Sequence, residues 1–418
     1  MHPEFRAAFN AAFTEELYRR QTDLLAELVG GHAEFRLAET PVFLTPQMTE
    51  RFVTAATEIL AQISRPEAIA RMKSAIPKQW DTPGMDALPS LAQIDLAVVR
   101  AEDGSLVPKL IELQGFPSLS CFEVLQADAW SRVLQEVPGL PREEWLPYFS
   151  GLDRTEYLAL LKRTIVGGHD PEEVILMDLT PEKQKTWVDF AATKKLLDVD
   201  AVCPTTLEKQ GASLFRVKGG RRLPVRRIYN RVVFDELIKK DVALPFDFRD
   251  DLDVEWVPHP NWYWTWSKYS LPLISHPAVP KATYLSELTE LPDDLTEKFV
   301  LKPLFSFAGG GVNVEPTRED IERVPEAERG VWCLQEKIAY APALEAVDGG
   351  GVKVEIRMMF YRPDDSDRFT LGLNLCRLSR GKMLGVDFNK DFTWVGSSVA
   401  LHPEEKASGM EATLHLNR

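Results

Sequence analysis

The chain has 418 residues and a mass of 47.3 kDa, and its 44% hydrophobic and 10% aromatic content suits roughly two or three packed domains. The formal net charge of -14 argues against a nucleic-acid partner, because counterion release on the phosphate backbone needs a basic face. An anionic small molecule would therefore need a local cluster of cations.

The first residues, MHPEFRAAFNAAFTEELYRR, are charged throughout and lack the apolar core of a signal peptide. No run approaches the ~18 apolar residues of a membrane span, so we expect a cytoplasmic protein without a membrane partner. The four cysteines are far apart and form no CxxC pair, so neither a zinc site nor a disulfide framework is predicted. We interpret all four as buried thiols: Cys121, Cys203, Cys333 and Cys376.

The N-terminal part predicts helices followed by a hairpin. Residues 3–28 and 47–75 have apolar positions at helical spacing and are expected to form amphipathic helices. Two strand-like runs follow, Ile94–Val99 and Val107–Leu113, and the turn-forming AEDGS between them predicts a hairpin. A helix is expected from about Phe122 to Leu134, and the proline-rich VPGLPREEWLP then indicates a boundary.

From Glu173 the pattern alternates: a strand (VILMDL), a helix (Pro181–Leu197), a short strand (DAVC) and a second hairpin that reaches RRIYNRVVF. This order predicts a small parallel α/β domain. The hairpin carries five arginines, which either clamp a carboxylate-bearing substrate or form a solvated face. They are Arg221, Arg222, Arg226, Arg227 and Arg231.

Past Pro258 an aromatic segment, HPNWYWTWSKYSLPL, precedes the last strands. Its aromatic residues either wall a pocket or, as is more usual for such clusters, belong to a core. They are Trp262, Tyr263, Trp264 and Trp266. A helix is expected near Arg318–Arg323, and further strands are predicted at WCLQEKI, VKVEIRMMFY and RFTLGLNLCRL.

The segment FVLKPLFSFAGGGV, residues 299–312, puts Lys302 at the end of an apolar strand directly before a glycine-rich turn. The glycines let the loop turn through positive φ and bring backbone N–H groups to an anion. The chain has no Walker A pattern and no strand followed by GxGxxG, so another kind of phosphate site is predicted, with a flexible hairpin as the alternative. The candidate ligands in this loop are Ser306, Ala308, Gly309, Gly310 and Gly311.

Two further signals accompany the loop. Lys268 is a candidate second cation, although a single lysine is usually solvated; each Lys–phosphate contact is worth on the order of 4 kcal/mol at an effective dielectric near 20, before desolvation. In WCLQEKI, backbone groups would pair with an adenine edge and the acidic side chain would hold ribose hydroxyls, with an ordinary amphipathic strand as the alternative. The residues concerned are Gln335, Glu336 and Lys337.

The early hairpin carries a candidate metal site. Glu112 and Gln114 are two apart on a strand and point to one face, where Asp95 on the partner strand faces them across the ladder. Oxygen ligands of this kind suit Mg²⁺, which binds through one or two carboxylates and bridges phosphates. A single strand carboxylate is more often solvated than metal-bound, but here three oxygen donors converge.

Taken together, these motifs resemble the ATP-binding half of an ATP-grasp ligase. In chain order they are Lys268, Lys302 with its SFAGGGV loop, LQEKI, VEIRMMF with Glu355 and Arg357, and LNLCRLSRG with Arg377. The metal-binding strand pair that usually ends such chains is found at the other end, as Asp95 and IELQGFPS. This order is similar to the circular permutation of eukaryotic glutathione synthetases and of the synthetase domain of glutathionylspermidine synthetases.

The resemblance covers roughly residues 90–400 and departs from the family at Gln114, where asparagine is usual. It implies an α/β (α+β) ATP-grasp fold, circularly permuted, with a Rossmann-like domain before the grasp and extra N-terminal helices. The expected parts are an N-terminal helical segment (1–90), the permuted C-terminal part of the ATP-grasp lobe with the metal-ligand hairpin (91–150), the Rossmann-like domain (151–257) and the nucleotide-binding domain (258–418).

The implied activity is that of an ATP- and Mg²⁺-dependent carboxylate–amine ligase, which forms an amide through an acylphosphate and releases ADP and phosphate. Its substrates would be small-molecule or peptide acids and amines. Lys268 and Lys302 would hold the α- and β-phosphates while the glycine loop covers the β- and γ-phosphates, and Asp95, Glu112 and Gln114 would bind Mg²⁺.

Arg357 and Arg377 would stabilise charge on the transferring phosphoryl and the tetrahedral intermediate, because the guanidinium fork matches both. Asn389 and Lys390 would lie near the γ-phosphate. A small-molecule kinase on the same fold and a non-catalytic ATP-binding protein are the alternatives.

Overall fold

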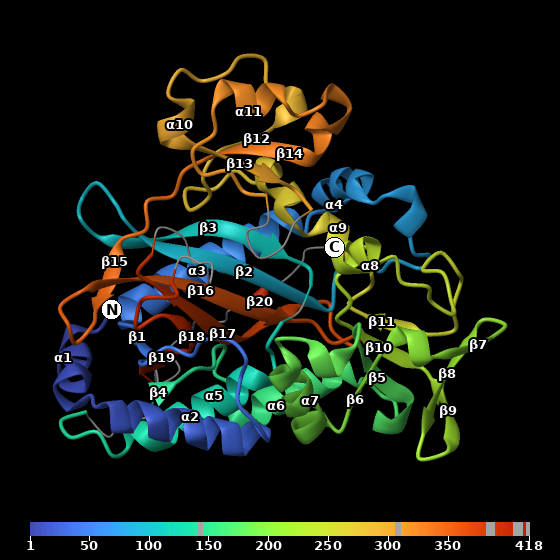
Figure 1. Cartoon of the computed structure of the whole chain (residues 1–418), viewed down its shortest axis with the longest axis horizontal. Coiled ribbons are helices and arrows are strands. Elements are labelled where there is room, and N and C mark those ends of the chain that lie inside the picture. The colour runs from blue at the N-terminus through green and yellow to red at the C-terminus, as the bar shows by residue number, and fades with distance from the viewer. Residues whose placement is uncertain (117, 141–144, 306–310, 382–388, 404–412, 415–418) are drawn as a thin grey trace.

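The computed structural model describes the whole chain except residues 117, 141–144, 306–310, 382–388, 404–412 and 415–418. Figure 1 shows a central sheet with helices packed around it, a small lobe above the sheet that contains β12–β14, and a parallel sheet to one side. Among the described residues, no helix has both the length and the apolar character that crossing a bilayer requires.

The central sheet joins strands from both ends of the sequence, and its pairings are antiparallel. The order is β18-β17-β16-β2-β3, with β15 beside β16 and β20 beside β17. The early strands are β2 (Leu91–Arg100) and β3 (Leu106–Gln114), the predicted hairpin. The late strands are β15 (Pro342–Glu345), β16 (Gly351–Tyr361), β17 (Phe369–Ser379), β18 (Gly396–Ser398) and β20 (Thr413–Leu414).

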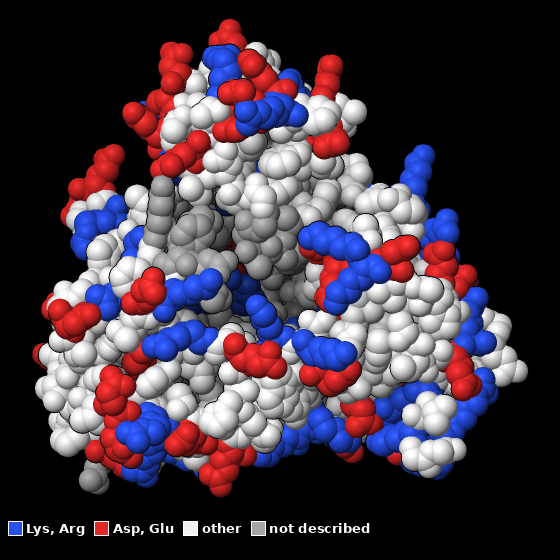
Figure 2. All heavy atoms as spheres, viewed as in Figure 1, with Lys and Arg blue, Asp and Glu red and all other residues white. Residues whose placement is uncertain are grey.

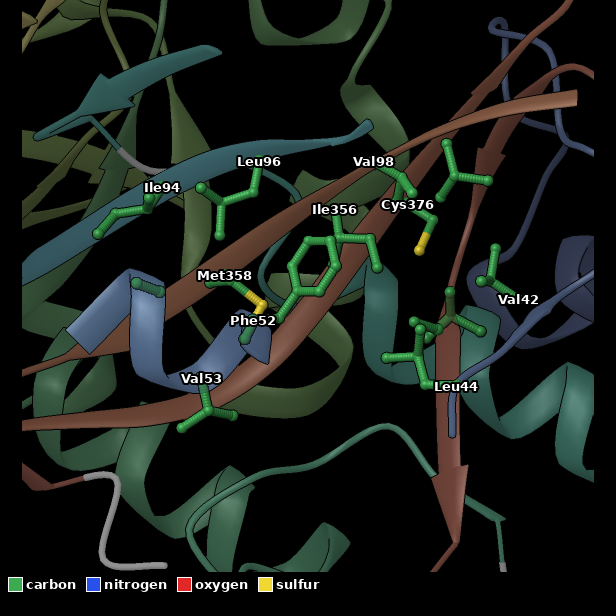
Figure 3. Packing of buried hydrophobic residues seen from close by; sticks show 14 of the residues in the cluster. Val42, Leu44, Phe52, Val53, Ile94, Leu96, Val98, Ile356, Met358 and Cys376 are labelled. Atoms are coloured by element: carbon green, nitrogen blue, oxygen red, sulfur yellow. The ribbon is translucent and has the colours of Figure 1, made fainter. Parts of the chain in front are cut away.

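One face of the central sheet packs on α3 (Pro46–Ile63). Alternation along β2 and β16 turns apolar side chains of both strands toward this helix, where Phe52 is fully buried. Figure 3 shows this layer, with Phe52 and Val53 of α3 opposite Leu96 of β2 and Met358 of β16. A small sheet lies at the end of this apolar layer. It is formed by β1 (Val42–Phe43), β19 (Ala400–Pro403) and β4 (Trp145–Leu146).

The two long N-terminal helices predicted from periodicity are each divided. The first splits into α1 (Pro3–Ala12) and α2 (Glu15–Val29), because the hydroxyl of Thr14 caps the second helix by accepting from the Leu17 N–H. The second splits into α3 and α4 (Pro66–Met72), because Pro66 cannot continue a helix but suits a first turn. The predicted helix Phe122–Leu134 is confirmed as α5.

The other face of the central sheet is covered by α5 and α6 (Arg154–Ile165), which lie below the sheet in Figure 1. The N-terminus of α5 is held by the buried carboxylate of Asp189, which accepts from the backbone N–H groups of Leu119, Cys121 and Phe122 at 3.0, 3.1 and 3.0 Å. Arg231 donates to the same carboxylate at 2.6 Å, so this buried ion pair joins the central sheet's helix to the neighbouring sheet.

The alternating region forms a four-stranded parallel sheet in the order β11-β10-β5-β6, as its pattern predicts. The strands are β5 (Val174–Met177), β6 (Asp200–Val202), β10 (Arg227–Asn230) and β11 (Glu255–Val257). Its helices are α7 (Trp187–Leu197) and α8 (Phe234–Lys240), and a separate antiparallel sheet beside it contains β7 (Glu208–Gln210), β8 (Ser213–Lys218) and β9 (Arg221–Val225).

Two predicted boundaries in this region are wrong. The helix expected from Pro181 begins at Trp187, because Pro181–Lys183 is a short 3-10 turn. The hairpin expected to reach RRIYNRVVF ends at Val225, and the next residues form β10, which pairs in parallel with β5. Local alternation of apolar residues does not reveal which partner a strand takes.

Asp178, which follows β5, gives the parallel sheet a pH-dependent stability. Burial raises the pKa of its carboxyl from 3.8 to about 7, although Arg231 acts in the opposite direction. Between these two pKa values the folded chain holds a proton that the unfolded chain has lost. The contribution of Asp178 to the free energy of unfolding is therefore fully present below about pH 4 and is lost as the pH rises through about 7. Asp178→Asn should therefore match the wild type at about pH 3 but exceed it by up to roughly 4 kcal/mol at about pH 9.

Urea unfolding of both proteins at the two pH values measures this difference. The Asn side chain keeps an oxygen for the Leu179 N–H, which donates to Oδ1 of Asp178 at 2.7 Å. Equal stabilities at both pH values would contradict the raised pKa.

The lobe above the central sheet has three strands in the order β12-β14-β13: β12 (Ala282–Tyr284), β14 (Trp332–Glu336) and β13 (Phe299–Pro303). One of its faces is apolar, and Leu301 and Leu334 pack there with residues of α10 (Leu295–Lys298) and α11 (Arg318–Glu322). The other face carries Lys302 and Cys333, which are direct cross-strand partners. The short helix α9 (Trp262–Thr265) and a 3-10 helix, Lys268–Leu273, precede the lobe.

The four cysteines are free thiols, as expected. Cys121, Cys333 and Cys376 are buried, but Cys203 is partly exposed, so the prediction of four buried thiols is wrong at that position. Cys203 follows the last residue of the edge strand β6, where there is no further strand to cover it.

Candidate functional site

The central sheet places a charged cluster on the face that carries α5. Asp95 of β2 lies directly opposite Arg357 of β16, and Glu355 lies opposite Arg377 of β17. The guanidinium of Arg357 binds Asp95 with two hydrogen bonds of 2.6 and 2.7 Å. Arg377 donates to both Asp95 and Glu355, so the two predicted catalytic arginines meet on one carboxylate.

The cluster is buried, and this sets its electrostatics. Burial would raise the pKa of Asp95, but the positive charges of Arg357 and Arg377 outweigh burial and hold that pKa below its usual value. Burial raises the pKa of Glu355 despite the opposing effect of Arg377. The phenol of Tyr340 donates to Glu355 at 2.8 Å, so Glu355 has a second hydrogen-bond partner besides Arg377.

The two candidate lysines lie on the lobe side of the hollow between the lobe and the central sheet, which is called the cleft below. Lys268 starts the 3-10 helix Lys268–Leu273, and its Nζ is 3.7 Å from Oε2 of Glu112. Lys302 of β13 is 9% exposed, and its ammonium has no ion pair or hydrogen bond with the described residues. Figure 2 shows a hollow between the lobe and the body of the molecule, with Lys and Arg side chains along its lower rim.

The pKa of Lys302 is lowered, chiefly by burial and further by the charge of Lys268, although Cys333 and Glu112 act in the opposite direction. An ammonium that is buried without a counter-ion, beside a second ammonium, is an unfavourable arrangement until an anion arrives. The burial and proximity of Lys268 and Lys302 favour the binding of a multiply charged anion, and the assignment of these two lysines to a phosphate site stays a prediction.

The end of β3 brings the candidate metal ligands into this cleft. Glu112 and Gln114 line a pocket together with Lys268, Tyr263 and Trp266. Gly115 fixes the strand end: its N–H donates to the carbonyl of Trp266 at 2.7 Å, and a Cβ at this position would lie 2.8 Å from the carbonyl oxygen of Trp262. Only glycine allows this close approach.

The aromatic segment belongs to the core, and two of its residues also line the pocket. All four aromatic residues are buried, which agrees with the core interpretation. Tyr263 and Trp266 also line the pocket beside Glu112, so the alternative interpretation holds for those two.

Two side chains at the end of β3 have the donor chemistry that Mg²⁺ would need. Glu112 and the carbonyl of Gln114 are hard oxygen donors, and the amide nitrogen of Gln114 donates to Glu112 at 2.5 Å, which leaves that carbonyl oxygen for a metal. Within the described ranges, no group of three or more His, Cys, Asp or Glu side chains is placed to hold a metal. Asp95 binds arginine with both oxygens, so its role as a metal ligand remains a prediction.

The glycine-rich loop lies mostly outside the described residues, which applies to Ser306, Ala308, Gly309 and Gly310. Gly311 is described and has φ of 73°, a conformation that L side chains rarely adopt. The positive φ expected of this loop is therefore present at its last glycine.

Two backbone N–H groups of the segment WCLQEKI are bonded within the lobe. The N–H of Glu336 donates to the carbonyl of Lys281 at 2.9 Å, and the N–H of Lys337 donates to the carbonyl of Lys298 at 2.7 Å. The pairing of this segment's backbone with an adenine edge stays a prediction. Gln335 is different: it is 1% exposed, and neither its Oε1 nor its Nε2 has a hydrogen-bond partner among the described residues.

The five arginines of the second hairpin have structural partners. Each binds a carboxylate of the neighbouring chain segments. Arg221, Arg222 and Arg226 are substantially exposed, which favours the solvated face, whereas Arg227 and Arg231 are buried in ion pairs.

The prediction that Asn389 and Lys390 lie near the γ-phosphate stays a prediction, and the described contacts give Asn389 a structural role. The side-chain carbonyl of Asn389 accepts from the hydroxyl of Ser379 and from the N–H groups of Arg380 and Gly381, at 3.0, 3.0 and 2.9 Å. Asn389 therefore holds the turn after β17, and Lys390 is exposed.

Sequence reasoning did not assign roles to Glu355 and Tyr340. Glu355 was detectable, because it is two residues from Arg357 on one strand and must share its face. Tyr340 lies in a loop before β15, and no pattern in the sequence connects it to Glu355.

The chain has a mixed α/β fold. Among solved structures, it is similar to a glutathione synthetase-like effector from Globodera pallida in the apo form, over 93% of this chain and 96% of the other, with a TM-score of 0.56 and 13% sequence identity. At this identity the likeness shows the fold alone. No family model matches the sequence, and no curated protein matches it.

Proposed function

We propose that this chain is an ATP- and Mg²⁺-dependent carboxylate–amine ligase of the circularly permuted ATP-grasp type. The observation that carries the proposal is the meeting of two distant segments: Glu112 of the early hairpin lies 3.7 Å from Lys268, and Lys302, which has no ion pair with the described residues, is a neighbour of both. An acidic oxygen opposite two ammonium groups suits a magnesium-bound triphosphate.

The permutation is proposed from the strand order and from the likeness in fold. The hairpin that contains Asp95 and Glu112 completes a sheet whose other strands follow residue 341. Joining strands by different loops is tolerated, because a sheet needs its strands in place rather than in one chain order.

In the proposed reaction, bound ATP supplies the phosphoryl group that activates a carboxylate as an acylphosphate. Lys268 and Lys302 bind and orient the phosphates, and Glu112 and Gln114 hold the magnesium ion. Arg357 and Arg377 place their guanidinium groups where negative charge develops, and Asp95 and Glu355 fix their positions. Such chemistry depends on position and charge more than on proton transfer.

A phosphate-release screen over pooled acids and amines tests the proposal, with Lys302→Ala as the blank. A ligase releases phosphate only when an acid and an amine are both present, and an amide accumulates in equal amount. A kinase would instead leave a stable phosphorylated product.

A second candidate, a nucleotide-binding protein without catalysis, is favoured by one observation: both oxygens of Asp95 are held by arginine, which leaves few carboxylates for metal. Thermal stabilisation by Mg-ATP without turnover under any acid and amine would select this candidate.

A further inference from the structure

The side chain of Gln335 is a buried polar group without a hydrogen-bond partner in the part of the chain that the structure describes. It is 1% exposed, and both polar atoms of its carboxamide lack hydrogen bonds to the described residues. Native proteins rarely leave such a group unsatisfied, because an unbonded buried amide loses its hydration without compensation. The position therefore suits a ligand that offers both a hydrogen-bond donor and an acceptor.

Gln335 lies on the face of the lobe that carries the phosphate lysine. Cys333 and Gln335 are two apart on β14, and their partners on β13 are Lys302 and Val300. Direct partners and residues two apart share a face of a sheet, so Gln335 and Lys302 point the same way. The opposite face is filled by Leu301 and Leu334 against the helices.

The backbone N–H and C=O groups at this position are already used in the sheet. β14 is the central strand of its sheet and pairs with β12 and β13 on either side, so its ladder groups are used. The next two N–H groups, of Glu336 and Lys337, are also bonded within the lobe. Only the carboxamide of Gln335 remains to provide a donor and an acceptor together.

We infer that the Gln335 side chain recognises the base of the bound nucleotide and selects adenine; this inference rests on the proposed function. A carboxamide presents one acceptor and one donor side by side, which match the amino group and ring nitrogen of adenine. Guanine presents two acceptors on the corresponding edge, so the carbonyl of Gln335 would face another acceptor. Apolar and aromatic neighbours on this face, including Tyr284 and Phe305, suit a flat base.

The test is calorimetric binding of ATP and GTP to the wild type and to Gln335→Met, which keeps the side-chain length but removes both polar atoms. The dissociation constant for ATP should rise roughly 10- to 100-fold, while that for GTP changes little. The ligand-free variant should unfold at the same temperature as the wild type or higher, because an unsatisfied amide has been removed.

Gln21→Met is the matched control. Gln21 of α2 is also fully buried, and both polar atoms of its amide lack partners among the described residues. Its replacement should change stability in the same direction and leave both nucleotide affinities unaltered.

Three outcomes are distinguishable. Weaker ATP binding by Gln335→Met alone supports the inference. If the wild type binds ATP and Gln335→Met binds it equally well, the inference is wrong and the proposed function stands. If the wild type binds neither nucleotide, both fail.

Discussion

Lys302→Met should lower ATP-dependent phosphate release by roughly 100- to 1,000-fold, because one Lys–phosphate contact is worth on the order of 4 kcal/mol before desolvation is subtracted. The same change should make the ligand-free protein more stable. Lys302 is 9% exposed and without an ion pair among the described residues, so its charge is held in an unfavourable place. A loss of activity that accompanies a gain in stability is the expected mark of a residue kept for binding an anion.

The gain in stability should depend on pH. Burial lowers the pKa of Lys302 below its ordinary 10.5, so the folded chain releases this proton before the unfolded chain does. The cost of the buried charge is complete below the folded pKa and shrinks as the pH rises toward 10.5. Urea unfolding of both proteins across this range measures the effect, and the advantage of Lys302→Met should be largest at neutral pH.

Lys298→Met is the control for Lys302→Met. Lys298 belongs to α10 of the same lobe, its side chain is 69% exposed, and it pairs with Asp294 on the surface. Its replacement should alter neither phosphate release nor stability appreciably, since exposed pairs contribute little. A wild-type rate of phosphate release in Lys302→Met would remove this residue from the site.

The early hairpin shows how far local patterns reach. Strand alternation and the AEDGS turn predict the hairpin, and its register holds from Arg100↔Leu106 to Leu96↔Leu110. Continued along the ladder, that register would pair Asp95 with Ile111, but a β-bulge between Asp95 and Leu96 shifts the partner to Glu112, and turn length does not reveal such a bulge. The split of the N-terminal helices was also open to prediction, from Thr14 as a cap and Pro66 as a first-turn residue.

The partners of Asp95 could not be predicted in the same way. Arg357 reaches it only because β2 pairs with β16, a strand far along the chain, and register between distant strands is set by the packing of the whole sheet. Nor does any sequence pattern show that the amides of Glu336 and Lys337 are used within the lobe while the carboxamide of Gln335 is not. Hydrogen-bond completeness is a property of the folded molecule.

Asp95→Asn should destabilise the ligand-free protein by about 3–5 kcal/mol, because removing one member of a buried ion pair leaves the other charge uncompensated. Arg357 would lose its only carboxylate partner among the ion pairs of the described residues, and Arg377 would keep Glu355 alone. Phosphate release should also fall sharply, since the guanidinium groups would no longer be fixed at the reacting centre.

The same variant separates two roles for Asp95. If this carboxylate anchors the arginines, Asp95→Asn weakens the protein without any metal, and the Mg²⁺ concentration for half-maximal phosphate release changes little. If Asp95 is instead a metal ligand, the Mg²⁺ requirement rises and the metal-free stability is nearly unchanged. The double variant Asp95→Asn/Arg357→Gln should be more stable than the sum of the single effects, because the two side chains interact directly. Additive effects would mean that the bidentate pair is not the source of the stability.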